Sequence, residues 1–312
     1  MIEAVELSKR YGQKLAVDSL TFSVRPGIVT GFLGPNGAGK STTMRLIVGL
    51  DRPTGGSVTV NGRPYAQHAA PLHEVGALLE AKAVHTSRSA INHLRALAAT
   101  HGIGRSRVED VIDLVGLHDV ARQRAGSFSL GMGQRLGIAS ALLGDPAVLM
   151  FDEPVNGLDP EGVRWVRDLL RQLAGEGRTI FVSSHLMSEM ALIAEHVIVI
   201  GRGRLIADTS VQELIRSAST NVVVVRTPAA DVLRDALEGP DVTVAVAASD
   251  ELEVTGLTAA QIGEIALDQR IVLHELTPRQ ASLEEAFMNM TQDSIEYHAR
   301  PPAAGSVEES LR

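Results

Sequence analysis

The sequence predicts an α/β fold: a mainly parallel sheet with an antiparallel β part at the N-terminal end, an inserted helical subdomain, and a small α+β domain towards the C-terminal end. Apolar runs that alternate with helical segments predict the parallel sheet, because parallel strands are buried on both faces and joined by helical crossovers. Helical spacing without strands over residues 89–143 predicts the subdomain. A change of pattern after about residue 216 predicts the second domain.

The first elements are expected to be two strands, a third strand and a helix. Ala4–Leu7 and Leu20–Val24 alternate apolar and polar residues around the turn-like Arg10–Lys14, which predicts an antiparallel pair. Val29–Leu33 is a short apolar run that ends in a glycine-rich loop, and Thr42–Leu50 has helical spacing. The chain therefore passes from strand through loop to helix at this point.

Three later apolar runs extend the predicted sheet, with helical segments between them. In chain order these segments are Val148–Phe151, Val163–Leu173, Thr179–Val182, Met187–Ala194 and Val197–Ile200. Strands that alternate with helices indicate parallel pairing. We therefore predict a first domain at residues 1–215, with the helical subdomain inserted at about residues 82–145.

Residues 216–292 are predicted to form a small α+β accessory domain. The order strand, helix, strand, strand, helix, strand is typical of a ferredoxin-like fold. The six elements are expected at Val222–Val225, Ala229–Leu237, Val242–Val246, Leu252–Val254, Ala259–Leu267 and Ile271–Leu273. Residues 293–312 contain Pro301 and Pro302 and lack periodicity, which predicts a disordered tail.

The charge distribution argues against nucleic-acid binding. Of the 29 basic and 37 acidic side chains, residues 216–312 carry 7 basic and 16 acidic ones. An acidic end repels a phosphate backbone, so no direct nucleic-acid partner is expected. The absence of cysteine excludes disulfides and thiolate metal sites and suits a reducing cytoplasm. No apolar run approaches the roughly 18 residues of a membrane span, so we expect a soluble chain that reaches a membrane through a partner.

The glycine-rich loop is a candidate phosphate-binding site. Gly34, Pro35, Asn36, Gly37, Ala38, Gly39, Lys40, Ser41 and Thr42 fit the pattern G-x-x-x-x-G-K-[ST]. Glycines let backbone amides converge on a phosphate, Lys40 would reach the β and γ phosphates, and Ser41 would hold Mg²⁺. The alternative is a glycine turn that precedes a lysine by chance, which a chain with only four lysines disfavours. The loop therefore predicts a P-loop NTPase.

Two adjacent carboxylates follow the apolar run Val148–Phe151. The carboxyl end of a parallel strand is where an α/β sheet presents ligands, so Asp152 is expected to hold Mg²⁺ and Glu153 to polarise the attacking water. A solvated strand end is the alternative. Two acids directly after four apolar residues, in a chain with a phosphate loop, favour the catalytic interpretation.

These motifs resemble the nucleotide-binding subunit of ATP-binding cassette (ABC) transporters over roughly residues 1–215. The segment Phe128–Arg135 is similar to the signature sequence of that family, although Leu130 and Met132 stand where its commonest form has Gly and Gln. Ser129 and Gly131 retain the residue types that give a hydroxyl and a close backbone contact, so the resemblance implies that they bind nucleotide. A helix N-cap at Ser129 is an alternative that is compatible with this role.

The resemblance assigns further residues by their place in the sequence. Tyr11 occupies the position of the aromatic residue that stacks on adenine, with a core or turn tyrosine as the alternative. Asn156–Asp159 is similar to the D-loop, which adds Asp159 to the nucleotide-binding residues. His185, at the end of Ser183–His185, resembles the switch histidine and would sense the γ phosphate, whereas a lone histidine is more often a surface or core residue.

One position departs from the family. The glutamine of its Q-loop should fall near Leu78–Ala81, but no glutamine occurs between His73 and Arg88. Glu80 takes that place. A carboxylate could bind Mg²⁺ or its water shell, yet it adds negative charge beside ATP and cannot donate a hydrogen bond at neutral pH.

The segment Leu273–Phe287 is similar to the ending of ATP-binding subunits from bacterial ABC-2 type exporters of drugs and peptide antibiotics. A capping box of Ser282 and Glu285, which would open a helix, explains the spacing without any function. The small domain therefore indicates a subfamily more than an activity.

The resemblance implies an ATPase motor that is complete only as a dimer. Two copies would sandwich two ATP molecules with Mg²⁺. Each site would join Lys40, Ser41, Asp152, Glu153 and His185 of one chain to Ser129 and Gly131 of the other. ATP hydrolysis is then expected to drive export of a drug, antibiotic or peptide through separate integral membrane permease subunits, at the cytoplasmic face of the cell membrane.

Two other functions compete with this hypothesis. Soluble ABC-type ATPases that act on DNA or ribosomes usually carry two cassettes, a long coiled coil or a basic arm, whereas this sequence has one cassette and an acidic end. A P-loop kinase for small molecules would leave Phe128–Arg135 and His185 unexplained. The transported substrate stays open, and a homodimer is simpler than a pair of different cassettes because one chain holds every motif.

Overall fold

The computed structural model describes residues 1–79, 84–218, 222–279 and 281–291. The strands are β1 (Ile2–Tyr11), β2 (Lys14–Val24), β3 (Val29–Leu33), β4 (Gly55–Val60), β5 (Val75–Leu78), β6 (Val148–Asp152), β7 (Thr179–Ser183), β8 (His196–Gly201), β9 (Arg204–Ser210), β10 (Val222–Arg226), β11 (Thr243–Ala248), β12 (Glu251–Thr255) and β13 (Glu275–Arg279). The α-helices are α1 (Lys40–Ile47), α2 (Pro71–Glu74), α3 (Ala90–Thr100), α4 (Arg105–Leu114), α5 (Leu130–Leu142), α6 (Pro160–Gly175), α7 (Met187–Ile193), α8 (Val211–Ala218), α9 (Ala230–Leu237), α10 (Ala259–Asp268) and α11 (Leu283–Thr291). Three 3₁₀ turns are η1 (Tyr65–Gln67), η2 (His118–Val120) and η3 (Ala125–Ser127).

A six-stranded sheet forms the centre of the large domain, in the order β5-β6-β7-β3-β8-β9. Every neighbouring pair is parallel except β8 with β9. All residues of β3 and β7 are buried, as expected of strands covered on both faces. The predicted parallel core is therefore confirmed, and the carboxyl ends of β3, β6 and β7 lie at one edge of the sheet.

The antiparallel N-terminal part is a second sheet with the order β2-β1-β4. Phe22 of β2 packs against Phe32 and Phe181 of the central sheet, with ring centroids 4.9 to 6.0 Å apart within this trio. Sequence analysis missed β4, β5 and β9. Strands β4 and β9 carry few buried apolar residues, and β5 has only four residues, so their places in the sheets depend on their neighbours.

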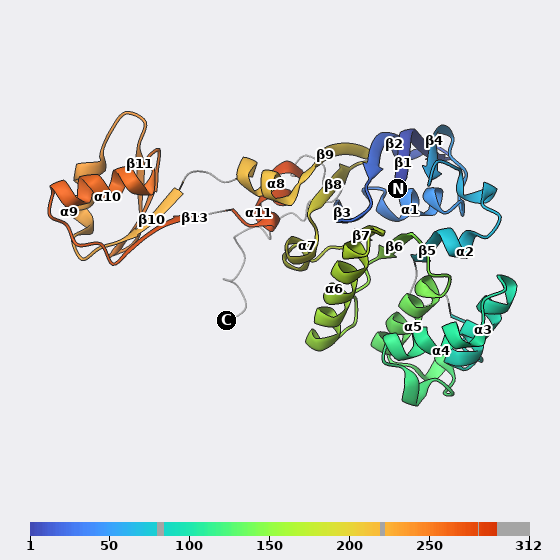
Figure 1. Ribbon diagram of the computed structural model, residues 1–312. Helices are drawn as coiled ribbons and strands as arrows, with labels where there is room; N and C mark the ends of the chain where they lie inside the picture. The colour runs from blue at the N-terminus through green and yellow to red at the C-terminus, as the bar shows by residue number, and fades with distance from the viewer. Residues whose placement is uncertain (80–83, 219–221, 280, 292–312) are drawn as a thin grey trace, which may run out of the picture.

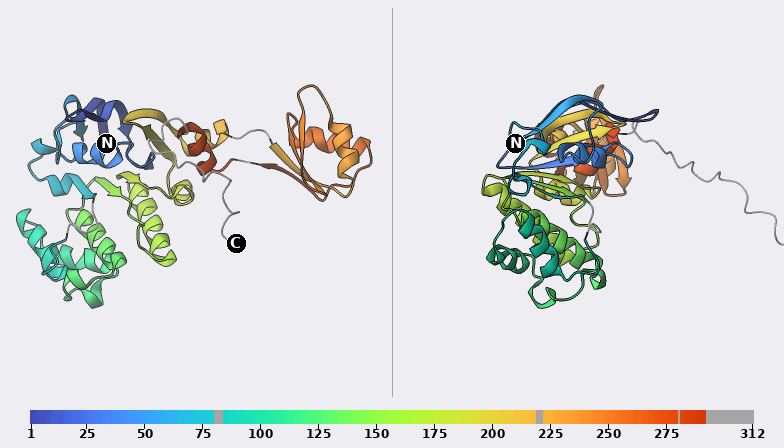
Figure 2. Two further views of the ribbon diagram at one scale, coloured as in Figure 1. Left: turned by 180° about the vertical axis from the view of Figure 1, so that it is seen from behind. Right: turned by 90° about the vertical axis from the view of Figure 1, so that its right-hand side faces the viewer.

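Helices α3, α4 and α5 pack together below the central sheet (Figure 1). Leu94, Val111 and Leu136, one from each helix, belong to a single buried core that continues to the sheet. Helix α5 also packs against β5, where a Cβ atom at Gly137 would lie 2.5 Å from Leu78 Cδ1. The side view in Figure 2 shows this helical part as a separate layer under the strands.

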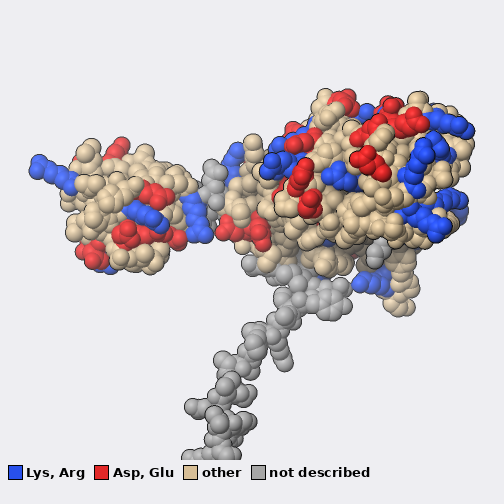
Figure 3. Space-filling model, turned by 90° about the horizontal axis from the view of Figure 1, so that it is seen from below, with Lys and Arg blue, Asp and Glu red and all other residues tan. Residues whose placement is uncertain are grey.

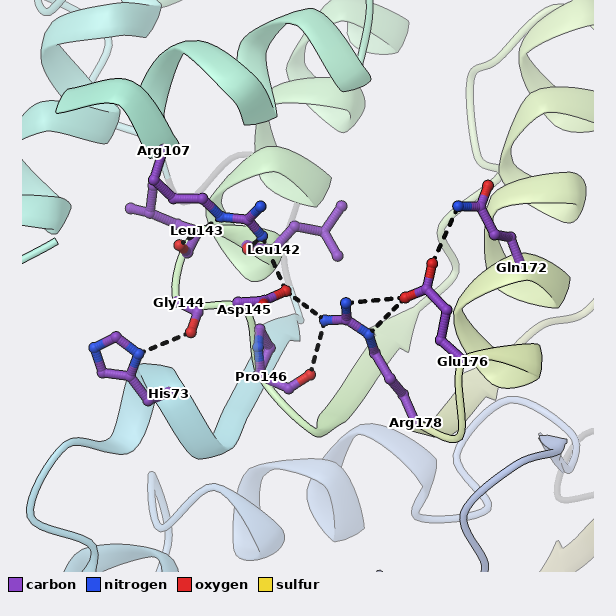
Figure 4. A network of polar contacts seen from close by, with 10 residues as sticks. All are labelled: His73, Arg107, Leu142, Leu143, Gly144, Asp145, Pro146, Gln172, Glu176 and Arg178. Carbon is purple, nitrogen blue, oxygen red and sulfur yellow. Dashed lines mark hydrogen bonds and ion pairs between the residues drawn. The ribbon is translucent and has the colours of Figure 1, made fainter. Parts of the chain in front are cut away.

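A polar network fixes the carboxyl end of α5 (Figure 4). Arg107 of α4 donates to the carbonyl oxygen of Leu142 at 2.8 Å and to Asp145 at 3.2 Å. Arg178, which precedes β7, pairs with the same carboxylate at 2.9 Å and with Glu176 at 3.0 Å. Asp145 therefore connects the helical layer to the central sheet through two arginines.

The small domain has the element order β10-α9-β11-β12-α10-β13, and its four strands pair antiparallel in the order β11-β12-β10-β13. Helices α9 and α10 cover one face of this sheet over a separate core (Figure 1). The last strand was predicted at Ile271–Leu273, which is wrong: β13 is Glu275–Arg279. The apolar residues Ile271 and Leu273 pack on this core from the preceding loop, whereas β13 is mostly polar.

Helix α11 returns to the large domain and packs on α7 and α8. Its Leu283, Ala286 and Phe287 belong to the core of the large domain, so the prediction that residues 216–292 form one accessory domain is wrong for this last helix. The predicted capping box opens α11: Ser282 Oγ accepts from the Glu285 N–H at 3.1 Å, and Glu285 Oε2 accepts from the Ser282 N–H at 2.8 Å. The tail predicted at residues 293–312 lies outside the described residues. None of the helices in the described ranges is long and apolar enough to cross a membrane.

Candidate nucleotide site

The loop between β3 and α1 forms one wall of a cavity of about 420 Å³. Gly37 and Gly39 have φ angles of 82° and 106°, which other residues rarely adopt. A Cβ atom at Gly39 would lie 2.5 Å from the carbonyl oxygen of Ala16, and one at Gly34 would lie 2.5 Å from that of Ile200. The path of the loop therefore requires glycine at these positions.

The cavity collects residues from four separate stretches of the chain. Its described lining consists of Tyr11, Lys14, Ala16, Pro35, Asn36, Gly37, Ala38, Gly39, Lys40, Ser41, Thr42, Asp152 and Glu153. Backbone amides at the start of a helix and a lysine suit an anionic polyphosphate, and the carboxylates suit a cation beside it. Most of the predicted nucleotide-binding residues thus border one space.

Lys40 holds its ammonium group over the loop. Its Nζ donates to the carbonyl oxygens of Gly34 at 2.6 Å and Pro35 at 3.4 Å. Burial lowers the pKa of Lys40, while the carboxylates of Glu153 and Asp152 act in the opposite direction. Because a phosphate oxygen is a stronger partner for an ammonium group than a neutral carbonyl, a bound polyphosphate would compete well for this side chain.

The Ser41 hydroxyl and the Asp152 carboxylate contact each other in the lining of the cavity. Ser41 Oγ donates to Asp152 Oδ2 at 2.8 Å. Hydroxyl and carboxylate oxygens are the ligand types that Mg²⁺ takes beside phosphates, so these two residues fit the predicted Mg²⁺ site. Glu80, the third predicted Mg²⁺ residue, lies outside the described residues.

Glu153 adopts a left-handed backbone conformation with φ of 52°. Its N–H donates to the carbonyl oxygen and to Oγ of Ser183, at 3.2 Å each. The Ser183 hydroxyl donates in turn to Asp152 Oδ1. The side-chain amide of Gln134 donates to the carbonyl oxygen of Glu153 at 3.1 Å. Ser183 and Gln134, both buried, therefore fix the Asp152 carboxylate and the backbone of Glu153.

Sequence analysis alone did not single out Ser183 or Gln134. Each stands inside a quoted motif, Ser183–His185 or Phe128–Arg135, but without a role of its own. The available signal was a polar residue directly after an apolar run in the first case, and within a helical apolar pattern in the second. That signal is weak, because its meaning depends on what lies opposite in the folded chain.

His185 completes the polar cluster. Its Nδ1 lies 2.7 Å from Glu153 Oε2, and its backbone N–H donates to the same oxygen at 3.3 Å. The imidazole is 54% exposed, so it remains accessible to a ligand. The loop after β7 thereby contacts the carboxylate of Glu153, which directly follows β6.

Comparison with known proteins decides the family. The profile of the ABC transporter family matches residues 17–156. The chain is 36% identical over 304 residues to an uncharacterized ABC transporter ATP-binding protein of Bacillus subtilis, YhcH. The alignment covers 95% of this chain and 97% of YhcH. The chain belongs to the ABC transporter ATP-binding proteins. It is an ATPase subunit that binds ATP.

Further comparisons extend this assignment. The ABC subunit is 40% identical over 211 residues to the bacitracin transport ATP-binding protein BcrA of Bacillus licheniformis, covering 67% of this chain and 69% of BcrA. A solved dimeric ATP-binding cassette in a post-hydrolysis state with ADP and Pi shares its fold, with a TM-score of 0.62 and 22% identity over 67% of this chain and 98% of that one. The profile of a domain of unknown function, DUF8746, matches residues 221–284.

Some of the predicted site residues of this ABC subunit do not line the cavity. Its described lining includes neither Ser129, Gly131 and Asp159 nor Gly34 and His185. Ser129 caps α5, since its Oγ accepts from the Met132 N–H at 3.2 Å. A Cβ atom at Gly131 would lie 3.3 Å from the carbonyl oxygen of Gly157. Asp159 caps α6, and its Oδ1 accepts from the Gly162 N–H at 2.9 Å.

Proposed function

We propose that two copies of this ABC subunit close on two ATP molecules, and that each site joins the cavity of one chain to Ser129 and Gly131 of the other. One observation carries this proposal: the cavity gathers the phosphate loop and both carboxylates, while the signature residues lie outside its described lining. The N-terminus of α5 is capped by Ser129 and its first residue, Leu130, is 52% exposed. Its amides are therefore available to an anion on a second chain.

In the proposed site each residue has a defined role. Lys40 neutralises phosphate charge, Glu153 accepts a proton from the attacking water, and His185 contacts the γ phosphate while it holds Glu153. Ser41 and Asp152 would hold Mg²⁺, which when bound supplies charge neutralisation at the phosphates. Tyr11 stacks on the adenine, and Asp159 contributes from the D-loop beside the signature residues.

Mixing two inactive variants tests the shared site. Lys40→Ala disables the phosphate loop and Ser129→Arg blocks the signature helix, so neither homodimer hydrolyses ATP. In an equal mixture about half of the dimers are heterodimers with one intact site, which restores about a quarter of the parental activity. As a control, each variant must first show parental thermal stability. A mixture that stays as inactive as its components would then refute a site shared between chains.

We also propose a membrane permease as the partner, docking at a second cavity. This cavity, of about 470 Å³, lies between α1 and β5 on one side and α3 and α5 on the other. Its lining is mainly apolar and includes Val48, Leu78 and Leu97. His93 also lines it, is 9% exposed, and has no partner for Nδ1 among the described residues. An apolar surface with a buried, unsatisfied polar atom suits an amphipathic segment of another protein.

Copurification tests the partner. The tagged subunit is isolated from gently solubilised membranes of its host, and an integral membrane protein is expected in stoichiometric amount. Leu97→Glu should remove that protein while the isolated subunit keeps its ATPase activity. Recovery only in the soluble fraction, or with DNA or ribosomes, would overturn the transport proposal. Figure 3 shows acidic and basic side chains on both parts of the face seen from below, with Lys and Arg gathered at the right-hand end of the larger part.

The proposed cargo is a drug, an antibiotic or a peptide, exported from the cell. The support is the similarity to BcrA, whose name links it to bacitracin transport. The test compares the antibiotic sensitivity of host cells that carry the parental subunit with that of cells that carry Glu153→Gln. Equal sensitivity to a panel that includes bacitracin would count against this cargo class.

A further inference from the structure

The ring of Tyr11 is held at its hydroxyl group by a residue outside the predicted site. Tyr11 ends β1, borders the 420 Å³ cavity and is 45% exposed. Its hydroxyl donates to Asp51 Oδ2 at 2.9 Å. Asp51 follows α1 and has no assigned role in any motif. An exposed tyrosine at a strand end would otherwise have rotamer freedom to lose on binding a base.

Asp51 is itself fixed. Arg45, in the last turn of α1, pairs with the same carboxylate oxygen at 2.7 Å, and the Asp51 side chain is only 20% exposed. Hydrogen bonds from Arg45 and Tyr11 hold the pKa of Asp51 below its usual value. Asp51 is therefore a carboxylate at neutral pH, anchored to the helix that carries Lys40.

One face of the Tyr11 ring is already covered. The ammonium group of Lys9 lies 4.9 Å from the ring centroid, which is within cation–π range. Lys9 Nζ also donates to the carbonyl oxygen of Arg52 at 2.7 Å, next to Asp51 in the chain. A planar ligand therefore has only the face opposite Lys9, and the ring is fixed at its face and at its hydroxyl.

We propose that Asp51 is a positioning residue for nucleotide binding, which orients the Tyr11 ring to stack on the adenine. The proposal rests on the stacking role of Tyr11 given above. Asp51 connects the Tyr11 ring at the end of β1 to α1, which follows the phosphate loop. The ring that stacks on the adenine and the loop that binds the phosphates are therefore positioned together before the nucleotide binds. Preorganisation of this kind improves affinity because less freedom is lost when the ligand binds.

The test compares ADP with pyrophosphate, by titration calorimetry, because the two ligands differ by the adenosine group and neither is hydrolysed by this ATPase. Asp51→Ala should raise the Kd for ADP about fivefold, the scale of one lost hydrogen bond, and leave the Kd for pyrophosphate unchanged. Tyr11→Phe keeps the ring and should have a similar effect. The effects of the two changes on ADP binding should not add in the double variant, because both remove the hydrogen bond between Tyr11 and Asp51.

Asp18→Ala is the matched control. Asp18 is 24% exposed and pairs with Arg204 at 2.6 Å, so it resembles Asp51 in burial and charge pairing but not in contact with Tyr11. Asp51→Asn, which keeps an oxygen acceptor, serves if Asp51→Ala proves unstable and should have a smaller effect on ADP.

The outcomes separate the two proposals. If Tyr11→Leu leaves ADP binding unchanged, the stacking role of Tyr11 is wrong. If Tyr11→Leu weakens ADP binding but both Asp51 variants bind it normally, only the positioning role is wrong. An equal loss of ADP and pyrophosphate binding in Asp51→Ala would also overturn it, because the effect would then act through the phosphate loop.

Discussion

Ser183→Ala is expected to lower ATP turnover while leaving ATP binding nearly unchanged. The Ser183 hydroxyl donates to Asp152 Oδ1 and accepts from the Glu153 N–H at 3.2 Å. Alanine removes both contacts without adding volume to a fully buried position. Because the two carboxylates belong to the proposed hydrolysis site, the change acts on the geometry of catalysis rather than on the phosphate loop.

The size of the expected fall in kcat depends on which of the two lost hydrogen bonds another group can replace. The Glu153 N–H also donates to the carbonyl oxygen of Ser183 at 3.2 Å, and this bond remains in the variant. Losing the Ser183 hydroxyl as a second acceptor therefore costs little. The bond to Asp152 involves a charged acceptor, and such a bond contributes about 1.5 to 3 kcal/mol. Because Asp152 is partly exposed, a hydrogen bond from water replaces part of this free energy. At about 1.4 kcal/mol per factor of ten, the expected loss in kcat is about tenfold.

The assay measures phosphate release at saturating ATP, ATP binding and the thermal midpoint for each variant. Ser184→Ala is the matched control, because Ser184 is buried next to Ser183 but its hydroxyl accepts from the Leu186 N–H at 3.0 Å. The reasoning is refuted if Ser183→Ala keeps the parental kcat, or if Ser184→Ala loses as much. A fall in kcat that follows a fall in thermal midpoint would also contradict it, because the effect would then be one of stability.

Four further predictions concern separate parts of the chain. Glu153→Gln should reduce phosphate release about 10²- to 10⁴-fold and preserve ATP binding, as expected for loss of a general base; parental turnover would exclude this role. Lys40→Ala should weaken ATP binding itself, and an unchanged Kd in calorimetry would contradict the phosphate-loop assignment. Asp51 has a pKa below its usual value, so its stabilisation is present above the unfolded pKa and is lost as pH falls through the folded one; the thermal midpoints of the parent and Asp51→Asn should differ at pH 7 and converge in acid. Phe287→Ala should destabilise the large domain by about 3 kcal/mol in urea denaturation, because buried phenylalanine is costly to truncate, whereas an unchanged midpoint would show that α11 is not part of that core.

Prediction from the sequence succeeded where the signal was local. Val29–Leu33 and Thr179–Val182 are short, mostly apolar runs, and both lie within fully buried strands. The capping box at Ser282 and Glu285 was found because both partners lie within one turn of a helix. The family, the cassette fold and the ATPase activity followed from short motifs with fixed spacing.

Prediction failed where a segment takes its structure from its neighbours. Strand β13, Glu275–Arg279, carries Pro278 and charged residues, and only its pairing with β10 makes it a strand. The apolar Ile271 and Leu273 were mistaken for that strand because burial in a loop and burial in a strand look alike in sequence. Edge strands such as β9 have the same difficulty, since they pair with another strand of the sheet on one side only.

By itself, the sequence determined the phosphate loop, the buried strands and the helix caps, because each depends on residues a few positions apart. Only the tertiary structure decided which of these residues meet. The Ser41 hydroxyl contacts a carboxylate 111 positions away, and Tyr11 contacts Asp51 across 40 positions. The sequence could not show that α11 belongs to the large domain, because this depends on the packing of its apolar side against α7 and α8. Contacts between distant segments depend on the shape of the folded backbone, and no spacing along the chain records that shape.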